Sequence, residues 1–252
     1  HLRTKDNNPC VVLPTGTGKS LVLAQIAKDS VEKWNGRVLI LAHVKELLEQ
    51  NADKIRKLCP ELKIGIYSAG LRSRDTTEQV IVAGIQSVYN KACELDAFDL
   101  VVVDEAHAIS SEGDGMYRTF LADMKVINPH VRVIGLTATP FRLKGGLICK
   151  PENILNEICY EAGLKEMIQQ GYLSPLISRA GRAEANLANL HIRGGEFISD
   201  EVAAAMDNDA LVTSACQISL TPVYWIPPTV RPGATQVTVV NVPFTVISTR
   251  PF

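Results

Sequence analysis

The chain has 252 residues, enough for one large domain or two small ones with a buried core. Its 46% hydrophobic and 21% charged residues are typical of a globular protein. The net charge of −1 gives no overall basic field, which weakens nucleic acid as a partner without excluding it, because local patches can still bind a strand. Six scattered cysteines without a Cys-x-x-Cys pair argue against a zinc site or disulfide framework and favour a reducing cytoplasm. No apolar run approaches the roughly eighteen residues of a membrane-spanning helix, so we expect a soluble protein with no membrane partner.

Short apolar runs alternate with helical periods from residue 10 to about 140. The runs predict strands at Cys10–Leu13, Val38–Ala42, Lys63–Tyr67, Val80–Ala83, Leu100–Asp104 and Val131–Leu136. A first helix, ended by Asn35-Gly36, is predicted from Ala24, Ala27, Val31 and Trp34. A second helix, stopped by Cys59-Pro60, is predicted from Val44, Leu47, Leu48, Asn51, Ile55 and Leu58. Val, Ile and Leu runs separated by helices predict an α/β, doubly wound fold with a mainly parallel sheet covered on both faces.

The alternation loosens after Pro140. A helix at Leu164–Gln170 and the stretch GYLSPLI would close a first domain of residues 1–178. Residues 179–219 predict a helical linker with two short helices, the first capped by Ser199 or Asp200 and the second by Asp207–Asp209. Residues 220–252 form an irregular tail with six of the thirteen prolines and two charges, for which we expect disorder.

Two interpretations of this tail stay open. It could come from a reading-frame change or a fused foreign segment, because charge and helical period disappear abruptly near residue 219. It could instead be a genuine extension in which TQVTVV pairs as an edge strand, since its prolines would exclude it from the middle of a sheet. Translation of the other two reading frames separates these interpretations.

The stretch LPTGTGKS lies between a predicted strand and a predicted helix. A glycine-rich loop in this place lets backbone N–H groups converge on a phosphate, and the helix N-terminus adds its positive dipole end. Gly16 and Gly18 permit close approach, Lys19 would reach the β- and γ-phosphates, and the hydroxyl of Ser20 would bind Mg²⁺. The general pattern G-x-x-x-x-G-K-[ST] has glycine where this chain has Leu13, so a chance glycine-lysine-serine loop is the alternative.

The stretch LVVVDEAH places two acids, Asp104 and Glu105, at the carboxyl end of a hydrophobic strand. Ligands bind at that edge of a doubly wound sheet, beside the phosphate loop. Asp104 could hold Mg²⁺ through water, and Glu105 could activate a water that attacks the γ-phosphate. The alternative, that both acids only cap the next helix, is disfavoured by the phosphate loop upstream.

The stretch GLTATP follows another predicted strand. Thr137 and Thr139 flank Ala138, and their hydroxyls could relay changes at the γ-phosphate through hydrogen bonds. The alternative is a plain turn into Pro140.

Taken in this order, LPTGTGKS, DEAH and TATP resemble motifs I, II and III of the superfamily 2 helicases, over roughly residues 10–216. The stretches LAHVKELLEQN, YSAGL, GIQSV and GYLSPL resemble the bacterial RadD-type DEAD/DEAH-box proteins, which are linked to DNA repair. Related phage helicases and the motor subunits of type I restriction enzymes share many of these sequence stretches. The resemblance implies a RecA-like P-loop NTPase lobe that uses ATP and Mg²⁺ and contacts nucleic acid, with DNA favoured over RNA.

The resemblance also implies a role for each matching residue. The implied phosphate loop comprises Thr15, Gly16, Thr17, Gly18, Lys19 and Ser20. The implied magnesium acid is Asp104, the base is Glu105, and His107 couples the nucleotide state to a neighbouring motif. The implied motif III comprises Thr137, Ala138 and Thr139. The implied nucleic-acid contacts are His43, Val44, Lys45, Gly70, Gln86 and Ser87. For two of these the alternatives are a satisfied loop histidine at 43 and an ordinary solvated helix start at 45.

Two departures from the family pattern bear on activity. The superfamily has a glutamine-containing, adenine-recognising motif before motif I, and no glutamine precedes Gln25, so we expect the chain to begin after that element. The motor also needs a second RecA-like lobe that supplies an arginine to the ATP site. The cluster SRAGR at Ser178–Arg182 lies too close to motif III to belong to such a lobe, and we assign it to the linker.

The expected function is therefore the ATP-binding lobe of a nucleic-acid-dependent ATPase, a helicase or translocase that hydrolyses ATP to ADP and phosphate. On its own this chain should bind ATP·Mg²⁺ weakly and hydrolyse it slowly. The alternatives are a catalytically incompetent nucleotide-binding or interaction module, and the motor lobe of a type I restriction enzyme. A P-loop kinase or transferase is disfavoured, because DEAH followed by TAT has no role in that chemistry.

Overall fold

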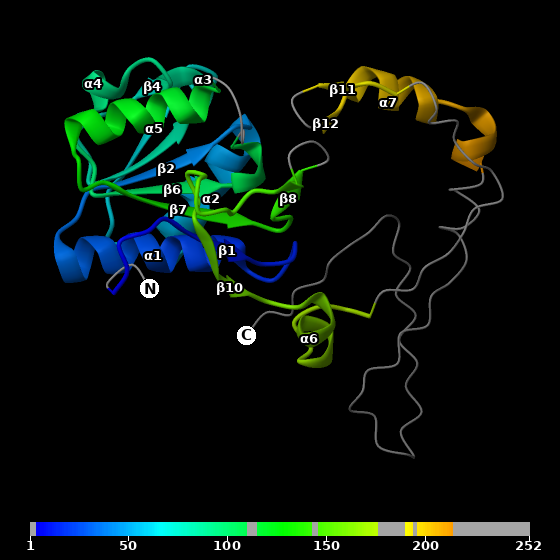
Figure 1. Ribbon diagram of the computed structural model, residues 1–252, viewed down its shortest axis with the longest axis horizontal. Helices are drawn as coiled ribbons and strands as arrows, with labels where there is room; N and C mark the ends of the chain where they lie inside the picture. Colours follow the sequence, from blue (N-terminus) through cyan, green and yellow to red (C-terminus); the bar gives the residue numbers. More distant parts are fainter. Residues whose placement is uncertain (1–3, 110–114, 143–145, 176–189, 194–195, 214–252) are drawn as a thin grey trace. The chain divides into compact units, whose positions relative to one another are not determined.

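The computed structural model describes residues 4–109, 115–142, 146–175, 190–193 and 196–213 (Figure 1). The chain divides into two units, His1–Gln170 and Gly171–Phe252, and each is described by itself. The expected domain limit near residue 178, the SRAGR cluster and the tail 220–252 lie outside the described residues, so the domain limits stay a prediction.

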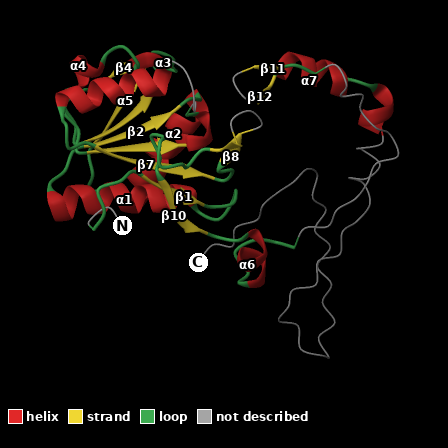
Figure 2. Cartoon of the chain, viewed as in Figure 1, coloured by secondary structure: helices red, strands yellow, loops and turns green. Residues whose placement is uncertain are grey.

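An eight-stranded sheet forms the centre of the first unit (Figure 2). Its strands, in order across the sheet, are β10 (Glu157–Glu161), β1 (Pro9–Val12), β7 (Arg132–Thr137), β6 (Leu100–Asp104), β2 (Val38–Ala42), β5 (Val80–Gly84), β3 (Ile64–Ser68) and β4 (Ser73–Arg74). All neighbouring pairs are parallel except β3 and β4. Strands β2, β5 and β6 are buried at every residue, which explains why their sequences are near-continuous apolar runs.

Helices cover both faces of this sheet, which confirms the α/β, doubly wound prediction (Figure 1). On one face lie α3 (Ile85–Val88), α4 (Ala92–Leu95) and α5 (Met116–Ile127). The other face carries α1 (Lys19–Trp34) and α2 (Lys45–Leu58), which pack against each other. The α5 side forms a continuous core that includes Leu39, Ile81, Leu95, Phe98, Val101, Phe120 and Met124.

The predicted elements match the structure closely within this unit. The first predicted helix ends where expected, because Asn35 adopts the left-handed conformation (φ 50°) at its C-cap. The helix expected at Leu164–Gln170 is α6 (Leu164–Gln169). Strand β10 was not predicted, because its residues EICYE are only half-buried or exposed at the sheet edge and give no apolar run. A short hairpin of β8 (Phe141–Arg142) and β9 (Gly146–Leu147) follows β7.

The described part of the second unit holds a small hairpin and two helical segments. The hairpin pairs β11 (Ile192–Arg193) with β12 (Glu196–Phe197), and α7 (Ser199–Met206) follows it. The predicted cap at Ser199 or Asp200 is wrong, because Ile198 occupies the N-cap position without a side-chain cap hydrogen bond. The second predicted cap is confirmed within its range: Asn208 Oδ1 accepts from the N–H of Ala210 at 2.9 Å, and residues 209–213 are helical.

Gly135, in the middle of β7, gives a test of how this sheet packs against the DEAH segment. A Cβ at this position would lie 2.6 Å from Leu155 Cδ1 and 2.8 Å from Ala106 Cβ. Since Ala106 can retreat only with its backbone, we expect Gly135→Ala to lower the free energy of unfolding by about 1–3 kcal/mol in urea titrations. In the control Gly70→Ala, the added Cβ would approach no atom closer than 3.7 Å, so a change of at most about 0.5 kcal/mol is expected. Equal losses in both variants would contradict the packing argument.

Candidate functional site

The order of the strands brings the three motifs together. Strand β7 lies between β1 and β6, and all three run parallel, so their carboxyl ends meet at one edge of the sheet. The phosphate loop follows β1, Asp104 ends β6, and Thr137 ends β7. Segments more than a hundred residues apart in the chain therefore form one site, at the edge where α/β proteins bind ligands.

The phosphate loop has the conformation that the sequence predicts. Gly16 (φ 84°) and Gly18 (φ 96°) are left-handed, a region that side chains with a Cβ rarely adopt. The Thr17 hydroxyl donates to the Pro14 carbonyl at 2.6 Å, which closes the loop on itself. Helix α1 begins at Lys19, so its N-terminal N–H groups and dipole face this loop. The Ser20 hydroxyl makes no hydrogen bond with the described residues, so it is available to a ligand.

A line of polar contacts links the phosphate loop to the other two motifs. Lys19 Nζ lies 2.6 Å from Glu105 Oε1, and His107 Nδ1 lies 3.4 Å from Glu105 Oε2. The same His107 nitrogen is 3.1 Å from Thr137 Oγ1. The hydrogen bond to His107 and the ion pair with Lys19 hold the pKa of Glu105 at about 2, against burial, which raises it. Glu105 is therefore an ionised carboxylate clamped between two nitrogen groups.

The backbone of Glu105 is strained. Its φ of 50° is left-handed, a conformation that costs a glutamate of the order of 1–2 kcal/mol. The N–H of Glu105 donates to Asp104 Oδ1 at 3.0 Å, and the short 3-10 helix η1 (Ala106–Ala108) begins directly after it. No side chain caps η1, so the alternative that the two acids only cap the next helix is not supported.

Asp104 is held by a residue to which the sequence analysis gave no functional role. Its side chain is buried, and Asn51 Nδ2 on α2 donates to Asp104 Oδ2 at 2.7 Å. Asn51 was recognised only as one position of the buried helix face. The available signal was its polarity, because the neighbouring buried positions of that face, Leu48 and Ile55, are apolar.

The motif III residues form a tight turn that also reaches His107. The Thr139 N–H donates to Thr137 Oγ1 at 3.1 Å, and the Thr137 hydroxyl lies 3.2 Å from the Thr139 carbonyl. Thr137 is fully buried, and its carbonyl accepts from the N–H of Leu13 at 2.9 Å. Ala138 lies between the two threonines. The turn interpretation and the relay interpretation are thus compatible, because the same hydroxyl organises the turn and contacts His107.

The candidate nucleic-acid residues also lie together, beside the carboxyl ends of β2, β5 and β3. Gln86 Nε2 donates to the His43 carbonyl at 2.7 Å, which joins the segments after β5 and β2. Ser87 Oγ accepts from the N–H of Ala69 at 2.9 Å, next to Gly70. Val44 is the N-cap residue of α2, which begins at Lys45. A Cβ on Gly70 would lie 3.7 Å from Lys45 Cδ, so the two loops are in contact.

Two side chains of this group have polar atoms without a partner among the described residues. Lys45 is exposed and makes no ion pair or hydrogen bond with the described residues. His43 Nδ1 is buried without a hydrogen-bond partner among the described residues, so the alternative of a fully satisfied loop histidine is not supported. Of the two, the Lys45 ammonium, unpaired among the described residues, is exposed at the edge of the sheet that also carries the phosphate loop, whereas the His43 nitrogen is buried.

The residues at the site fit a nucleotide with Mg²⁺ better than a metal held by protein alone. Among the described residues there is no group of three or more His, Cys, Asp or Glu side chains placed to hold a metal ion. One hydroxyl and one carboxylate, Ser20 and Asp104, suit Mg²⁺, which commonly takes one or two protein oxygens and completes its shell with phosphates and water. None of the described helices is long and apolar enough to cross a membrane.

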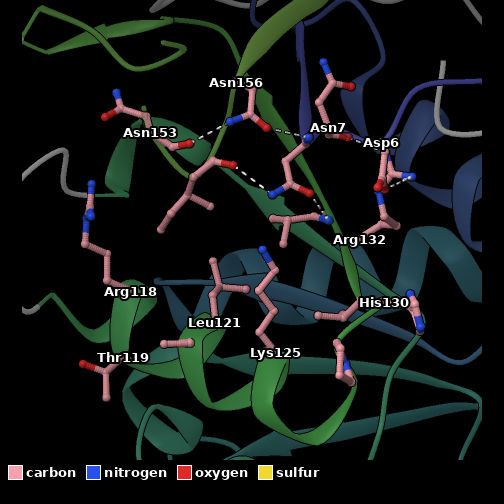
Figure 3. Close-up of a pocket in the computed structure, with 16 residues that line it drawn as sticks. Asp6, Asn7, Arg118, Thr119, Leu121, Lys125, His130, Arg132, Asn153 and Asn156 are labelled. Carbon is pink, nitrogen blue, oxygen red and sulfur yellow. Dashed lines mark hydrogen bonds and ion pairs between the residues drawn. The ribbon is translucent and has the colours of Figure 1, made fainter. Parts of the chain in front are cut away.

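A pocket of about 850 Å³ lies at the opposite edge, near the amino ends of β1, β7 and β10 (Figure 3). Its lining includes Arg118 and Lys125 from α5, and Asn153 and Asn156 from the segment before β10. None of the motif residues lines it. The size of this pocket therefore does not bear on the phosphate site, which is an open loop at the carboxyl edge.

The fold and the three converging motifs define a class of protein: the chain is an N-terminal RecA-like lobe of the superfamily 2 helicase type. The sequence profile of the family described as "Type III restriction enzyme, res subunit" matches residues 1–142, and the chain belongs to this family.

Similar proteins agree with this assignment. The "DNA 3'-5' translocase XPB2" of Sulfurisphaera tokodaii is 30% identical, over 65% of this chain and 34% of that protein. The "ATP-dependent RNA helicase DHX58" of Mus musculus is 30% identical, over 53% of this chain and 22% of that protein. The crystal structure of the Pyrococcus furiosus Hef helicase domain matches with a TM-score of 0.51 and 30% identity, covering 62% of this chain and 35% of that chain. The chain thus spans only about a fifth to a third of these relatives.

The clamped Glu105 carboxylate predicts how stability depends on pH. Its pKa falls from an ordinary 4.5 to about 2 in the folded chain, so it stabilises the fold above pH 4.5. That contribution is lost as the pH falls from 4.5 toward 2. At pH 7, Glu105→Gln should be less stable than wild type by about 1–3 kcal/mol in urea unfolding, and the difference should shrink below pH 4.5.

The matched control for this experiment is Glu49→Gln on the exposed side of α2. It should stay within about 0.5 kcal/mol of wild type at neutral pH. A Glu105→Gln difference that does not change between pH 7 and pH 3 would show that the contacts of the ionised carboxylate with His107 and Lys19 do not stabilise the fold.

Proposed function

We propose that this chain binds ATP with Mg²⁺ and serves as one lobe of a nucleic-acid-dependent ATPase that translocates on DNA. The observation that carries the proposal is the line of contacts from Lys19 through Glu105 and His107 to Thr137, since it connects all three motifs at one edge of the sheet. Family membership and the ATP-dependent helicase among the similar proteins support the same chemistry.

In this proposal each residue has a defined task. The backbone of Gly16, Thr17 and Gly18 binds the phosphates, and Lys19 exchanges its ion pair with Glu105 for the β- and γ-phosphates. Glu105, released from Lys19 and still ionised, accepts a proton from the attacking water. Mg²⁺, when bound, neutralises charge on the phosphates.

The remaining motif residues hold the metal and relay the result. Ser20 and Asp104 would hold Mg²⁺. Thr15 belongs to the phosphate loop that precedes Ser20. His107, between Glu105 and Thr137, reports the state of the γ-phosphate to Thr137, Ala138 and Thr139. A second RecA-like lobe would supply an arginine to the ATP site and close over the nucleic-acid strand.

DNA is the proposed nucleic acid, and the finer assignment is a RadD-type, DEAH-box helicase of the cytoplasm that acts in DNA repair. The RadD-like stretches between the motifs and the family description as a restriction enzyme support DNA. One similar protein is named a DNA translocase and another an RNA helicase. Because of the RNA helicase, binding of RNA should be tested as well. A motor lobe of a type I restriction enzyme, or a nucleotide-binding module without catalysis, are the alternatives.

The phosphate site is tested by two substitutions, one expected to weaken nucleotide binding and the other to lower turnover while binding is kept. Lys19→Ala should weaken binding of a fluorescent ATP analogue with Mg²⁺ by about 10- to 100-fold, because a charge-assisted contact to phosphate is lost. Glu105→Gln should keep that binding and lower ATP turnover by about 10²- to 10⁴-fold, with single-stranded DNA and a separately expressed second lobe present.

The control is Lys33→Ala, in the last turn of α1 and far from the loop, which should change neither quantity. Wild-type affinity in Lys19→Ala would rule out the phosphate loop as the nucleotide site. Failure of the second lobe to stimulate wild-type turnover would favour the module without catalysis. Turnover of ordinary helicase magnitude by the chain alone would contradict the need for a second lobe.

The candidate nucleic-acid contacts are tested at Lys45. Its ammonium is exposed and has no partner in the described part of the chain, so we expect Lys45→Ala to weaken binding of single-stranded DNA. One lost phosphate contact should lower the slope of log K against log salt by about 0.7–1. Lys57→Ala is the matched control, because it removes an exposed lysine from the same helix about 18 Å away along the axis. Equal salt slopes for the two variants would show that the DNA strand does not bind at Lys45.

A further inference from the structure

Asn51 is a buried amide in the middle of an apolar helix face. Its residue is 3% exposed, and the buried positions on either side of it along α2 are Leu48, Ala52 and Ile55. A buried amide without a partner costs free energy, so a polar residue persists at such a position only where it is hydrogen-bonded. Here the partner is the Asp104 carboxylate, 2.7 Å away.

Asn51 and the backbone together fix both oxygens of that carboxylate. Asn51 Nδ2 donates to Oδ2, and the N–H of Glu105 donates to Oδ1 at 3.0 Å. From the opposite face of the sheet, Tyr117 contributes no such contact, because its hydroxyl is buried without a partner among the described residues. Asn51 is therefore the side chain that sets the rotation of the Asp104 carboxylate.

The chemistry of an amide suits this task. An arginine or lysine in the same place would neutralise the carboxylate and compete with a cation. A neutral N–H donor orients the carboxylate and leaves its negative charge for a metal, in the way that outer-shell partners hold metal-binding carboxylates. Each carboxylate oxygen also keeps further lone pairs for a ligand or its water.

The helix that carries Asn51 begins at the candidate nucleic-acid segment. Lys45 is the first residue of α2, and Asn51 follows six residues later, about 9 Å along the axis. Since α2 is continuous between them, Lys45 and the group that orients Asp104 lie on one helix.

We propose that Asn51 is a positioning residue of the magnesium site: it holds Asp104 in the orientation that binds Mg²⁺ with a nucleotide, and it ties that orientation to α2. The proposal rests on the proposed function, because it requires a nucleotide at the phosphate loop. It goes beyond that function by assigning a role to a residue outside the three motifs.

The test measures binding, so it does not depend on turnover. The dissociation constant of a fluorescent ADP analogue is determined for the 252-residue chain, once with Mg²⁺ and once with EDTA. The dissociation constant in EDTA divided by the dissociation constant with Mg²⁺ reports how much the metal strengthens binding. Asn51→Leu, similar in size without hydrogen-bonding groups, should lower this ratio by about tenfold or more and leave the EDTA value within about twofold. Asp104→Asn gives the reference for loss of the metal-binding acid.

The matched control is Ile55→Val, which trims the same buried face of α2 one turn further on without touching Asp104. It should keep the wild-type ratio. Asn51→Ser, whose hydroxyl is too short to span the contact with Asp104, is the second variant should the leucine chain not fold, and thermal unfolding identifies folded variants. It should lower the ratio in the same way.

The outcomes separate this proposal from the function on which it rests. A wild-type ratio in both Asn51→Leu and Asn51→Ser would overturn the role of Asn51 and leave the nucleotide site in place. A parallel loss of affinity with Mg²⁺ and with EDTA would overturn it too, because it would show only a structural role. No binding of the analogue by wild-type chain would refute the nucleotide site itself, and the positioning role with it.

Discussion

The adjacency of β1, β7 and β6 is the constraint on which the site depends. Parallel strands end at the same edge, so placing these three side by side joins a loop, an acid pair and a threonine turn that lie far apart in the sequence. The packing is tight: Gly135 of β7 has no room for a Cβ beside Ala106 of the DEAH segment. A larger residue at position 135 of β7 would push against Ala106 and displace the turn that carries Glu105.

The ion pair between Lys19 and Glu105 places stability and function in opposition. Each group is the counter-charge of the other, and their contact favours the folded state in which Glu105 is left-handed. In the proposed function Lys19 binds the phosphates, and since it cannot serve both Glu105 and a phosphate to the full, nucleotide binding would weaken this contact. Strain and a contact that has to be exchanged are common at functional sites, and here they occur on the same residue.

The sequence predicted the central strands, the two long helices and all three motifs, because fully buried parallel strands produce unbroken apolar runs. It did not predict β10, since an edge strand with exposed glutamates has no such pattern. The sequence pattern did not predict the proposed role of Asn51 for a different reason. That role depends on Asp104, fifty-three residues away, and only the tertiary contact connects the two residues. The cap expected at Ser199 or Asp200 failed because α7 begins one residue after Ile198, and element ends are the least determined feature of a sequence pattern.

Strand β2 explains how one edge could serve both nucleotide and nucleic acid. Its neighbours are β6, which ends in Asp104, and β5, which leads into Gln86 and Ser87. The segment after β2, with His43 and Lys45, therefore lies between the acid of the nucleotide site and the other candidate strand contacts, and it continues directly into α2. His43, just before the N-cap of α2, accepts from Gln86, and Asn51 within α2 donates to Asp104, so this stretch of chain contacts both halves of the edge. Strand β2 pairs directly with both neighbours, and α2 adds a side-chain contact to Asp104, so the two halves of this edge share one strand and one helix.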